Sequence, residues 1–440
     1  MGENKEMPNG WTKALFEDLL DYIQPTKFIV ESTEYDDKYK IPVLTAGKSF
    51  IIGHTNETNG IFNEIPVIIF DDFTTATKFV NFPFKVKSSA MKILSPVGKL
   101  VNIKYVFGYM QTLRINADTH KRYWISHYSQ LPIPVPPLPE QHRIVAKIEE
   151  LFSSLDKGIE SLKTAQQQLK VYRQAVLKWA VEGRLTNENV KEGELPEGWK
   201  WVKLKVVADI TSSKRIFQHE YVSSGIPFYR TKEIKELSEG QPLSVDLFIS
   251  EAKYNEIKSR FPIPKKGDVL LSAVGTIGVS YVIKDNKPFY FKDGNLMWLK
   301  DLKGISPLFL SHGLTYFIRN KKGAKTSGSA YNALTIETMK DFDFPLPSLK
   351  EQHLIVAEIE SRLSVCDKIE ESIEESLKQS EALRQSILKK AFDGKLVPQD
   401  PNDEPASVLL DRIKAEREKS KLETPPRRQA GQIKAKKAKS

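Results

Sequence analysis

Two kinds of short motif in this sequence look like parts of nucleotide-binding or nuclease sites, and their spacing argues against both. Residues 46–49 read AGKS, the ending of a phosphate-binding loop, but the pattern GxxxxGK[ST] requires a glycine where Pro42 stands. The E-x-K triplets at 233–235 and 256–258 occur in nuclease centres, but neither follows a convincing strand that carries an aspartate, and such triplets are common on solvated helices. The sequence therefore predicts neither a nucleotide site nor a nuclease centre.

Other catalytic chemistry also lacks the residues it needs. The chain has no glycine-rich loop of the methyl-donor type, no Asn-Pro-Pro-aromatic or Asp-Pro-Pro-aromatic tetrad to hold a flipped base, and no Gly-x-Ser-x-Gly motif. The single cysteine, Cys366, falls on a helix seam, where a small buried thiol is expected, and the seven histidines offer no metal-ligand spacing. We expect no catalytic residue, no cofactor and no metal in this chain.

The net charge of +10 is unevenly distributed along the chain. By segment it is +1 for residues 1–139, +1 for 140–183, +7 for 184–350, −5 for 351–420 and +6 for 421–440. The excess on 184–350, which looks folded, suggests a polyanionic partner, whereas the Pro-, Lys- and Ala-rich tail is typical of a disordered extension. Because no apolar run approaches the ~18 residues that span a bilayer and no signal peptide is visible, we expect a cytoplasmic protein without a membrane partner.

The sequence contains an internal repeat. Residues 140–185 align without a gap with residues 351–396, which lie 211 positions later, and 21 of the 46 positions are identical. The motif P-x-G-W also occurs twice, at 8–11 and 196–199. The order is therefore variable segment, helix, variable segment, helix, tail.

Each repeated segment is predicted to be one amphipathic helix of about 43 residues, ~65 Å long. Apolar residues recur every seven positions, and Gly183 and Gly394 are suitable helix terminators. We expect the two helices to pack on each other in antiparallel orientation, with Gly158 allowing a close approach. Alternatively, each helix is an independent coiled coil that recruits another protein. The expected packing residues are Ile148, Leu155, Leu162, Leu169, Val176, Ile359, Ile373, Leu383 and Ile387.

The variable segments, 12–139 and 200–350, alternate β-branched and aromatic runs with turn residues, which is typical of α+β domains. Residues 65–75 predict a buried strand and a turn, residues 267–283 a strand, a Gly-bounded turn and a second strand, and residues 307–322 a short helix. The two segments show little sequence similarity to each other beyond their ends. A repeated frame with divergent inserts is expected where the inserts recognise different things.

The complete pattern resembles the specificity subunit of type I restriction-modification systems. P-x-G-W, a variable domain, P-x-P-x-L-x-E-Q-H and a heptad helix ending in G-[RK]-L all occur twice in this order, over residues 8–418. Local phrases also agree, namely IIFDDFTTATKFVNFPF, YWISHYSQLPIPVPPLPEQ, GDVLLSAVGTIG and VPQDPNDEPASVLLDRIKAERE. The basic tail lies outside the resemblance.

The resemblance implies an α+β fold in which two globular mixed α/β target-recognition domains are separated by two long antiparallel coiled-coil helices, in a pseudo-two-fold repeat. The expected boundaries are 1–139 and 186–350 for the target-recognition domains, 140–185 and 351–396 for the spacer helices, 397–422 for a C-terminal helical segment and 423–440 for a basic disordered tail.

The implied function is to bind a bipartite, asymmetric site on double-stranded DNA, one half per target-recognition domain. This binding would direct adenine methylation and restriction by partner subunits. The implied partners are two modification (methyltransferase) subunits and the restriction/translocase subunits. S-adenosylmethionine, ATP and Mg would be held by those partners and not by this chain.

In such a protein, DNA is contacted by side chains that reach base edges and by cations that neutralise phosphates. Residues 319–332 form the better cluster in the second domain, because cations alternate there with small hydroxyl residues, and residues 212–215 (SSKR) form another. The candidate residues are Thr74, Thr75, Lys78, Lys121, Arg122, Lys214, Arg215, Arg319, Lys321, Lys322, Lys325, Ser327, Ser329 and Tyr331, with His54, Asn56 and Tyr123 as further candidates in the first domain.

Two other functions remain open on the sequence. A stand-alone two-domain DNA-binding regulator would carry a helix-turn-helix or another known reader, and none is visible. A coiled-coil adaptor or scaffold protein would explain the helices, but it leaves the divergent inserts and the basic second domain without a purpose.

Overall fold

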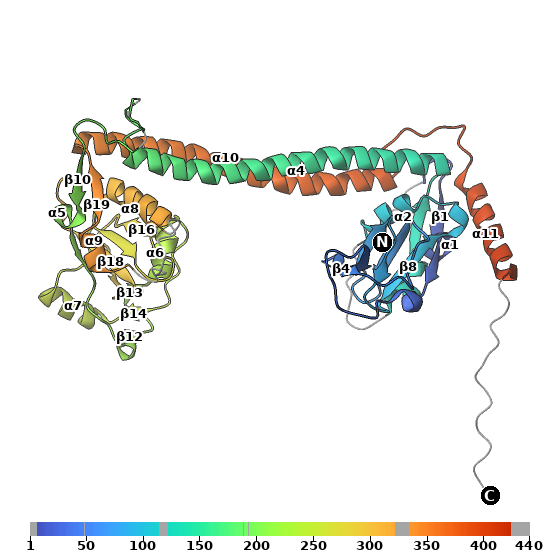
Figure 1. The fold of residues 1–440 in the computed structure, drawn as a ribbon, viewed down its shortest axis with the longest axis horizontal. Coiled ribbons are helices and arrows are strands. Elements are labelled where there is room, and N and C mark those ends of the chain that lie inside the picture. Colours follow the sequence, from blue (N-terminus) through green and yellow to red (C-terminus); the bar gives the residue numbers. More distant parts are fainter. Residues whose placement is uncertain are drawn as a thin grey trace, which may run out of the picture. The chain divides into compact units, whose positions relative to one another are not determined.

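The computed structural model describes residues 7–47, 49–113, 122–187, 189–191, 193–321 and 334–423. The chain divides into two compact units, residues 1–161 together with 376–440, and residues 162–375. Each unit contains one globular domain, called domain 1 (residues 7–137) and domain 2 (residues 193–348), and part of each of two long helices (Figure 1). Among the described residues, no helix is long and apolar enough to cross a membrane.

Domain 1 is built on a four-stranded antiparallel sheet with the strand order β2-β8-β5-β6. These strands are β2 (Leu20–Ile23), β5 (Val67–Asp71), β6 (Thr77–Val80) and β8 (Met91–Pro96). A second sheet contains β3 (Ile41–Leu44), β4 (Ile51–Thr55) and β7 (Lys85–Val86), and β1 (Thr12–Leu15) pairs with β9 (Pro132–Val135). The helices are α1 (Phe16–Leu19), α2 (Ile103–Met110) and α3 (Tyr123–Ser126), with 3-10 turns η1 (Pro25–Phe28), η2 (Val97–Lys99) and η3 (Tyr128–Gln130).

Domain 2 has a four-stranded antiparallel sheet with the order β11-β18-β15-β16. These strands are β11 (Asp209–Thr211), β15 (Val269–Ser272), β16 (Ser280–Val282) and β18 (Leu296–Lys300). A second sheet contains β12 (Tyr221–Val222), β13 (Ile226–Tyr229), β14 (Phe248–Ile249) and β17 (Tyr290–Phe291), and β10 (Lys200–Lys203) pairs with β19 (Asp343–Leu346). The helices are α5 (Leu204–Val207), α6 (Thr231–Ser238), α7 (Glu251–Arg260), α8 (Pro307–Lys321) and α9 (Ile336–Lys340), with the 3-10 turn η4 (Gln218–Glu220).

The two domains share one topology although their sequences diverge. Their four-stranded sheets have equivalent strand orders. The two-stranded pairs also share one register: Thr12 of β1 pairs with Val135 of β9, and the equivalent Lys200 of β10 pairs with Leu346 of β19. The strand predicted in 65–75, the hairpin predicted in 267–283 and the α+β class are confirmed. Inward positions require only apolar residues of suitable size, so sequences can diverge while the sheet is retained.

The repeated segments form two single helices, α4 (Leu138–Val181) and α10 (Leu349–Phe392), which run antiparallel (Figure 1). Both end in the same glycine motif. Gly183 has φ +74° and Gly394 has φ +69°, and the N–H of the next residue donates to the carbonyl five residues back, Arg184 to Trp179 and Lys395 to Lys390, at 2.8 Å in each case. The prediction that these glycines terminate the helices is therefore confirmed.

The prediction that the helices pack on each other is confirmed, through most of the expected stripe. The side chains of Ile148, Val176, Ile359, Ile373 and Ile387 are buried, and those of Leu155, Leu162 and Leu169 are half-buried. Cys366 is a buried free thiol on this stripe, as expected.

Leu383 was wrongly predicted to pack, because its side chain is 51% exposed. The heptad position seven residues after Leu377 is held by Arg384. Leu383 lies one residue before that position and therefore faces away from the seam. Arg384 stacks on the ring of Phe152, 4.5 Å from its centroid, and pairs with Asp156. The repeat-related pair recurs in the other unit, where Arg173 lies 2.7 Å from Asp367.

The role predicted for Gly158 is also wrong. A Cβ atom built on Gly158 would have nothing within 4 Å, so the absence of a side chain permits no close helix contact there. The position lies on an exposed part of α4.

The repeated motifs meet where each helix joins a domain. A Cβ on Gly183 would lie 2.2 Å from Pro196 Cγ, and a Cβ on Gly394 would lie 2.4 Å from Pro8 Cγ, so each P-x-G-W motif packs against a helix end. At the helix starts, the fully buried Gln141 and Gln352 use their side chains to bond backbone groups of the domains. After α10, a last helix, α11 (Ala406–Glu423), packs on domain 1.

Candidate nucleic-acid interface

Three loops of domain 2 meet at one end of its central sheet. They follow β11 (residues 212–215), follow β15 (residues 273–279) and precede β18 (residues 292–295). The Ala273 N–H donates to the Asn295 carbonyl at 2.8 Å, and the Ser212 hydroxyl donates to the Leu296 carbonyl at 3.1 Å. These bonds join the three loops into one surface, called the domain 2 loop face.

The predicted cluster at 212–215 lies on this face. The Lys214 ammonium is 4.5 Å from the ring centroid of Phe261, and its backbone N–H donates to the Tyr290 hydroxyl at 2.8 Å. Arg215 is 68% exposed and lies 2.8 Å from Asp293, which is part of the same face. Both cations are thus held at defined positions and remain open to solvent.

The described residues on either side of the second predicted cluster, Ile318 and Leu334, contact the loop at 273–279. Arg319 is exposed near the end of α8, where Ile318 packs against Gly278. The Leu334 N–H donates to the Ala273 carbonyl at 3.0 Å. Lys322, Lys325, Ser327, Ser329 and Tyr331, and the side chain of Lys321, lie outside the described residues. Residues 212–215 and Arg319, about a hundred residues apart in sequence, therefore lie at one end of one sheet.

A hollow of about 550 Å³ adjoins this face. One wall is formed by α6 and the residues up to Gln241, and the other by Val274, Gly275, Thr276 and Asn295. Amide and hydroxyl side chains such as those of Gln241, Asn295 and Thr276 can pair with base edges.

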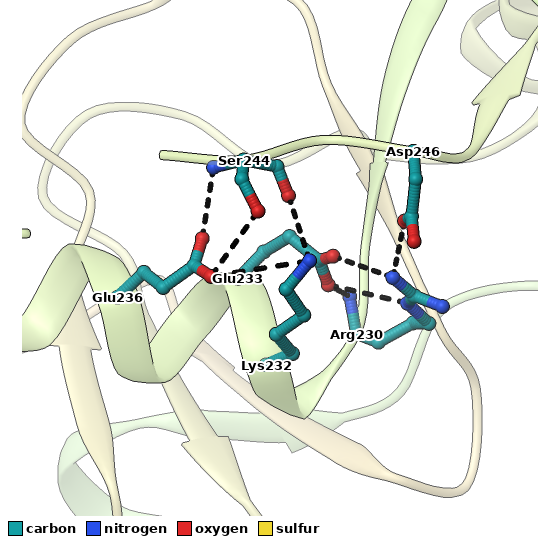
Figure 2. Close-up of polar contacts among 6 residues, drawn as sticks. All are labelled: Arg230, Lys232, Glu233, Glu236, Ser244 and Asp246. Atoms are coloured by element: carbon teal, nitrogen blue, oxygen red, sulfur yellow. Dashed lines mark hydrogen bonds and ion pairs between the residues drawn. The ribbon is translucent and has the colours of Figure 1, made fainter. Parts of the chain in front are cut away.

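A network of polar contacts fixes the α6 wall (Figure 2). The Ser244 N–H donates to Glu236 at 2.9 Å, and Lys232 donates to the Ser244 carbonyl at 3.2 Å, which ties the following loop to the helix. Glu233 is fully buried and accepts hydrogen bonds from the backbone and the side chain of Arg230, each at 2.7 Å. Burial alone would raise the pKa of Glu233, but the bonds from Arg230 outweigh burial and hold the pKa below its usual value.

Glu233 and Glu256, the acids of the two E-x-K triplets, are committed to structural ion pairs. Glu233 forms an ion pair with Arg230, and the exposed Glu256 lies 3.1 Å from Lys253 and 3.7 Å from Arg260. Within the described part of the chain, no three His, Cys, Asp or Glu side chains gather as metal ligands. Lys48 of the AGKS segment lies outside the described residues.

Domain 1 has an equivalent surface, the domain 1 loop face, around the turn between β5 and β6. The Asp72 N–H donates to the Ala90 carbonyl at 3.0 Å, as Ala273 does to Asn295. The Tyr123 N–H donates to the Asp72 carbonyl at 3.1 Å, as Leu334 does to Ala273. The two faces are therefore built on the same backbone hydrogen bonds.

The structure brings the candidates Thr74, Thr75 and Arg122 together on the domain 1 loop face. Thr74 is exposed and Thr75 has φ +58°, both within the turn, and the exposed Arg122 precedes Tyr123. Lys78 is half-buried on β6, next to the turn, and Lys121 lies outside the described residues. His54 and Asn56 belong to β4 and its end, in the other sheet of the domain.

Several residues of these faces were not singled out from the sequence. They are Phe73, Val274, Lys292 and Asn295. Phe73 and Val274 stand in the two segments that were predicted as strand and turn, and each directly follows the residue that anchors its face. Their position just after a predicted strand was the only sequence signal for them. That the two positions are equivalent depends on strand pairing, which is visible only in the folded chain.

Comparison with known proteins identifies related sequences over most of the chain. The family described as "Type I restriction modification DNA specificity domain" matches residues 8–170 and 196–379. The chain is 32% identical over 392 residues to the type I restriction enzyme EcoR124I/EcoR124II specificity subunit of Escherichia coli, which covers 84% of this chain and 89% of that protein. It is 30% identical over 339 residues to the EcoBI specificity subunit of the same species, covering 70% of each.

Solved structures show the same fold. A chain from a study of the assembly and conformational transition of a type I R-M system matches with a TM-score of 0.65 and 20% identity, covering 89% of this chain and all of that one. The HsdS subunit from Thermoanaerobacter tengcongensis matches with a TM-score of 0.57 and 20% identity, covering 90% of this chain and 99% of that one.

Proposed function

The chain belongs to the family of type I restriction-modification specificity subunits, and from this we propose that it selects the DNA sequence on which its partner subunits act. Domain 1 and domain 2 are its two target-recognition domains. We place DNA on the loop faces of the two domains, so that each domain binds one half of a bipartite, asymmetric site.

The observation that carries this proposal is the pair of equivalent loop faces. Their backbone hydrogen bonds are the same, whereas the side chains that they present differ, Thr74 and Thr75 in one turn and Gly275 and Thr276 in the other. A common frame with different side chains is suited to recognising two different half-sites. Cations at both faces would contact phosphates, which gives affinity, and the polar side chains of the turns and the hollow would contact base edges, which gives specificity.

Specificity subunits act in complexes with modification and restriction subunits, and we propose that the long helices provide docking surfaces for the modification subunits. In the unit that contains domain 2, Tyr172, Val365 and Ile369 leave 37%, 54% and 43% of their surface exposed on the helix pair, and exposed apolar side chains are typical of protein contacts. Leu383, the repeat equivalent of Tyr172, is exposed in the other unit. Of the three exposed positions, only that of Tyr172 keeps an apolar residue in the other unit, and we propose that one modification subunit docks on each unit.

The chemistry is assigned to the partners. We propose that the modification subunits methylate adenine with S-adenosylmethionine, that the restriction/translocase subunits use ATP and Mg, and that this chain contributes no catalytic group. The complex would act on cytoplasmic DNA.

An exchange of domains tests the proposed function. The central part of domain 2, residues 204–342, is replaced by the corresponding part of a relative with a different target, and the methylated motif is read by methylome sequencing. We expect one half of the motif to change and the other to persist, and the reciprocal exchange in domain 1 to do the converse. An active chimaera in which both halves change, or neither does, would contradict the assignment.

A further inference from the structure

An exposed apolar side chain stands at the same place on both loop faces. Phe73 is 49% exposed and Val274 is 37% exposed. Each is the first residue after the one whose N–H and carbonyl anchor the face, Asp72 in domain 1 and Ala273 in domain 2. Single exposed apolar residues are common on protein surfaces, so the informative point is that two domains with divergent sequences keep one at equivalent positions.

Both side chains are presented by turns that are fixed by hydrogen bonds. In domain 1, Asp71 Oδ1 accepts from the N–H groups of Phe73 and Thr74 at 2.9 and 3.0 Å, and Thr75 adopts φ +58°. In domain 2, the Ser272 hydroxyl accepts from the Val279 N–H at 2.9 Å and donates to the Thr276 carbonyl. Residues at the same strand end, Asp71 and Ser272, therefore hold the two turns by side-chain bonds.

The surroundings of both residues suit DNA. The exposed cations Arg122 and Arg319 border the two faces, and the exposed Thr74 and Thr276 lie one and two residues after the apolar residues in the turns. On the base edges of the major groove the thymine 5-methyl is the apolar group, and an apolar side chain pairs with it. An apolar side chain held among cations and hydroxyl groups can therefore contact a thymine methyl while its neighbours contact phosphates and polar base edges.

We propose that Phe73 and Val274 each contact a thymine 5-methyl group, one in each half of the recognised site, and so help to determine specificity. This inference rests on the proposed function and deepens it. It agrees with the proposed methylation of adenine, because a half-site that contains a target adenine contains an A·T pair and therefore a thymine methyl.

The test removes the methyl group without changing base pairing. The complete chain is assembled with its modification subunits, and its affinity is measured for duplexes in which each thymine of the recognised site is replaced in turn by deoxyuracil. For the unaltered protein we expect one replacement in each half-site to weaken binding roughly fourfold, the equivalent of one buried methyl group. Phe73→Ala should abolish the sensitivity to deoxyuracil only in the half-site that domain 1 binds. Val274→Ala should abolish it only in the half-site that domain 2 binds.

Matched variants make the outcome decisive. Ile51→Ala and Val206→Ala remove exposed apolar side chains elsewhere in the same domains and should leave both sensitivities unchanged. Phe73→Leu should retain the sensitivity if the variant is folded. The inference is wrong if no thymine replacement weakens binding, or if a half-site has no A·T pair. It is also wrong if Phe73→Ala and Val274→Ala bind every sequence less tightly while the sensitivity to deoxyuracil persists. That last result would indicate that the side chains insert as wedges between base steps. Failure of the proposed function is seen separately, as a domain exchange that leaves the methylated motif intact.

Discussion

At the scale of single residues, the repeated motifs serve one purpose: their side chains attach each domain to the ends of the long helices. The side chains of Gln141 and Gln352 accept hydrogen bonds from the N–H groups of Asn102 and Ser306, at 3.1 and 2.6 Å, near the starts of α2 and α8. Their amide groups also donate to Pro136 and Pro347, five residues earlier, at 3.0 and 2.9 Å. A buried glutamine that satisfies several backbone groups cannot be replaced by an apolar residue without leaving those groups unpaired.

Not every repeated position keeps its partner. The Trp11 indole N–H donates to Glu140 at 3.0 Å, whereas the equivalent Trp199 indole N–H is buried without a hydrogen-bond partner among the described residues. Glu351, the repeat equivalent of Glu140, instead accepts from Thr186 and Asn187. The two junctions therefore agree in packing and differ in polar contacts.

The glycine junction leads to a prediction about stability. Gly183→Ala places a Cβ 2.2 Å from Pro196 Cγ at a φ of +74°, so we expect a loss of about 2 kcal/mol or more from the left-handed backbone and the overlap together. Gly158→Ala is the matched control, because it lies inside α4 with free space around it, and it should stabilise the chain by about 0.5–1 kcal/mol. Thermal unfolding of both variants measures the difference, and equal melting temperatures would contradict the prediction.

At the scale of secondary-structure elements, α11 completes the core of domain 1. Ala406, Leu409 and Ile413 of α11 are buried in the core of that domain, and the Ala406 N–H donates to the Gly10 carbonyl at 2.9 Å. Arg417 lies 3.2 Å from Asp21 and donates to the Leu20 carbonyl at 2.8 Å. The element therefore covers an apolar surface near the start of the domain.

Truncation of this helix should destabilise domain 1 and leave domain 2 intact. Removing residues 406–440 exposes the cores around Leu409 and Ile413, and burying each such side chain is worth about 1.5–3 kcal/mol, so we expect a loss of about 3–6 kcal/mol in domain 1. Removing only residues 424–440, the part of the basic tail that follows α11, is the control and should not change unfolding. Hydrogen exchange resolved by peptide distinguishes the domains, and a longer truncation that leaves exchange in domain 1 unchanged would rule out a structural role for α11.

At the scale of the whole molecule, α4 passes without interruption from one compact unit into the other, and α10 returns antiparallel to it. The pairing of Arg384 with Asp156 in one unit and of Arg173 with Asp367 in the other fixes the register of the two helices within each unit. If the helices set the gap between the half-sites, a change in helix length must be made in both of them to preserve this register.

A paired insertion tests whether the helices measure distance. Four residues inserted after Ser161 and four after Glu375 add ~6 Å, because a helix advances ~1.5 Å per residue, and B-DNA advances ~3.4 Å per base pair. We expect the gap in the methylated motif to lengthen by one or two base pairs while both half-sites stay unchanged. The same insertion in α4 alone is the comparison, and it should impair assembly because the register is lost. An active paired variant with an unchanged gap would mean that the helices serve for docking only.

Features that depend on local pattern could be predicted from the sequence. The repeat, both long helices, their glycine ends and the strands within 65–75 and 267–283 follow from periodicity and from capping chemistry, which act within a few residues. The family and the lack of catalytic motifs could also be predicted from residue types and their order.

Which distant residues share a surface became visible only in the folded chain. A hydrogen bond joins Leu334 to Ala273 across sixty-one positions. The pairing of β11 with β18 and the contact of Ile318 with Gly278 bring residues 212–215 and Arg319 to the same face. Leu383 is exposed because the phase of the seam is set by contacts with the partner helix and not by apolar character alone. Phe73 and Val274 acquired a meaning only when the sheets of two divergent domains proved equivalent, since pairing between strands is a non-local interaction that no short stretch of sequence contains.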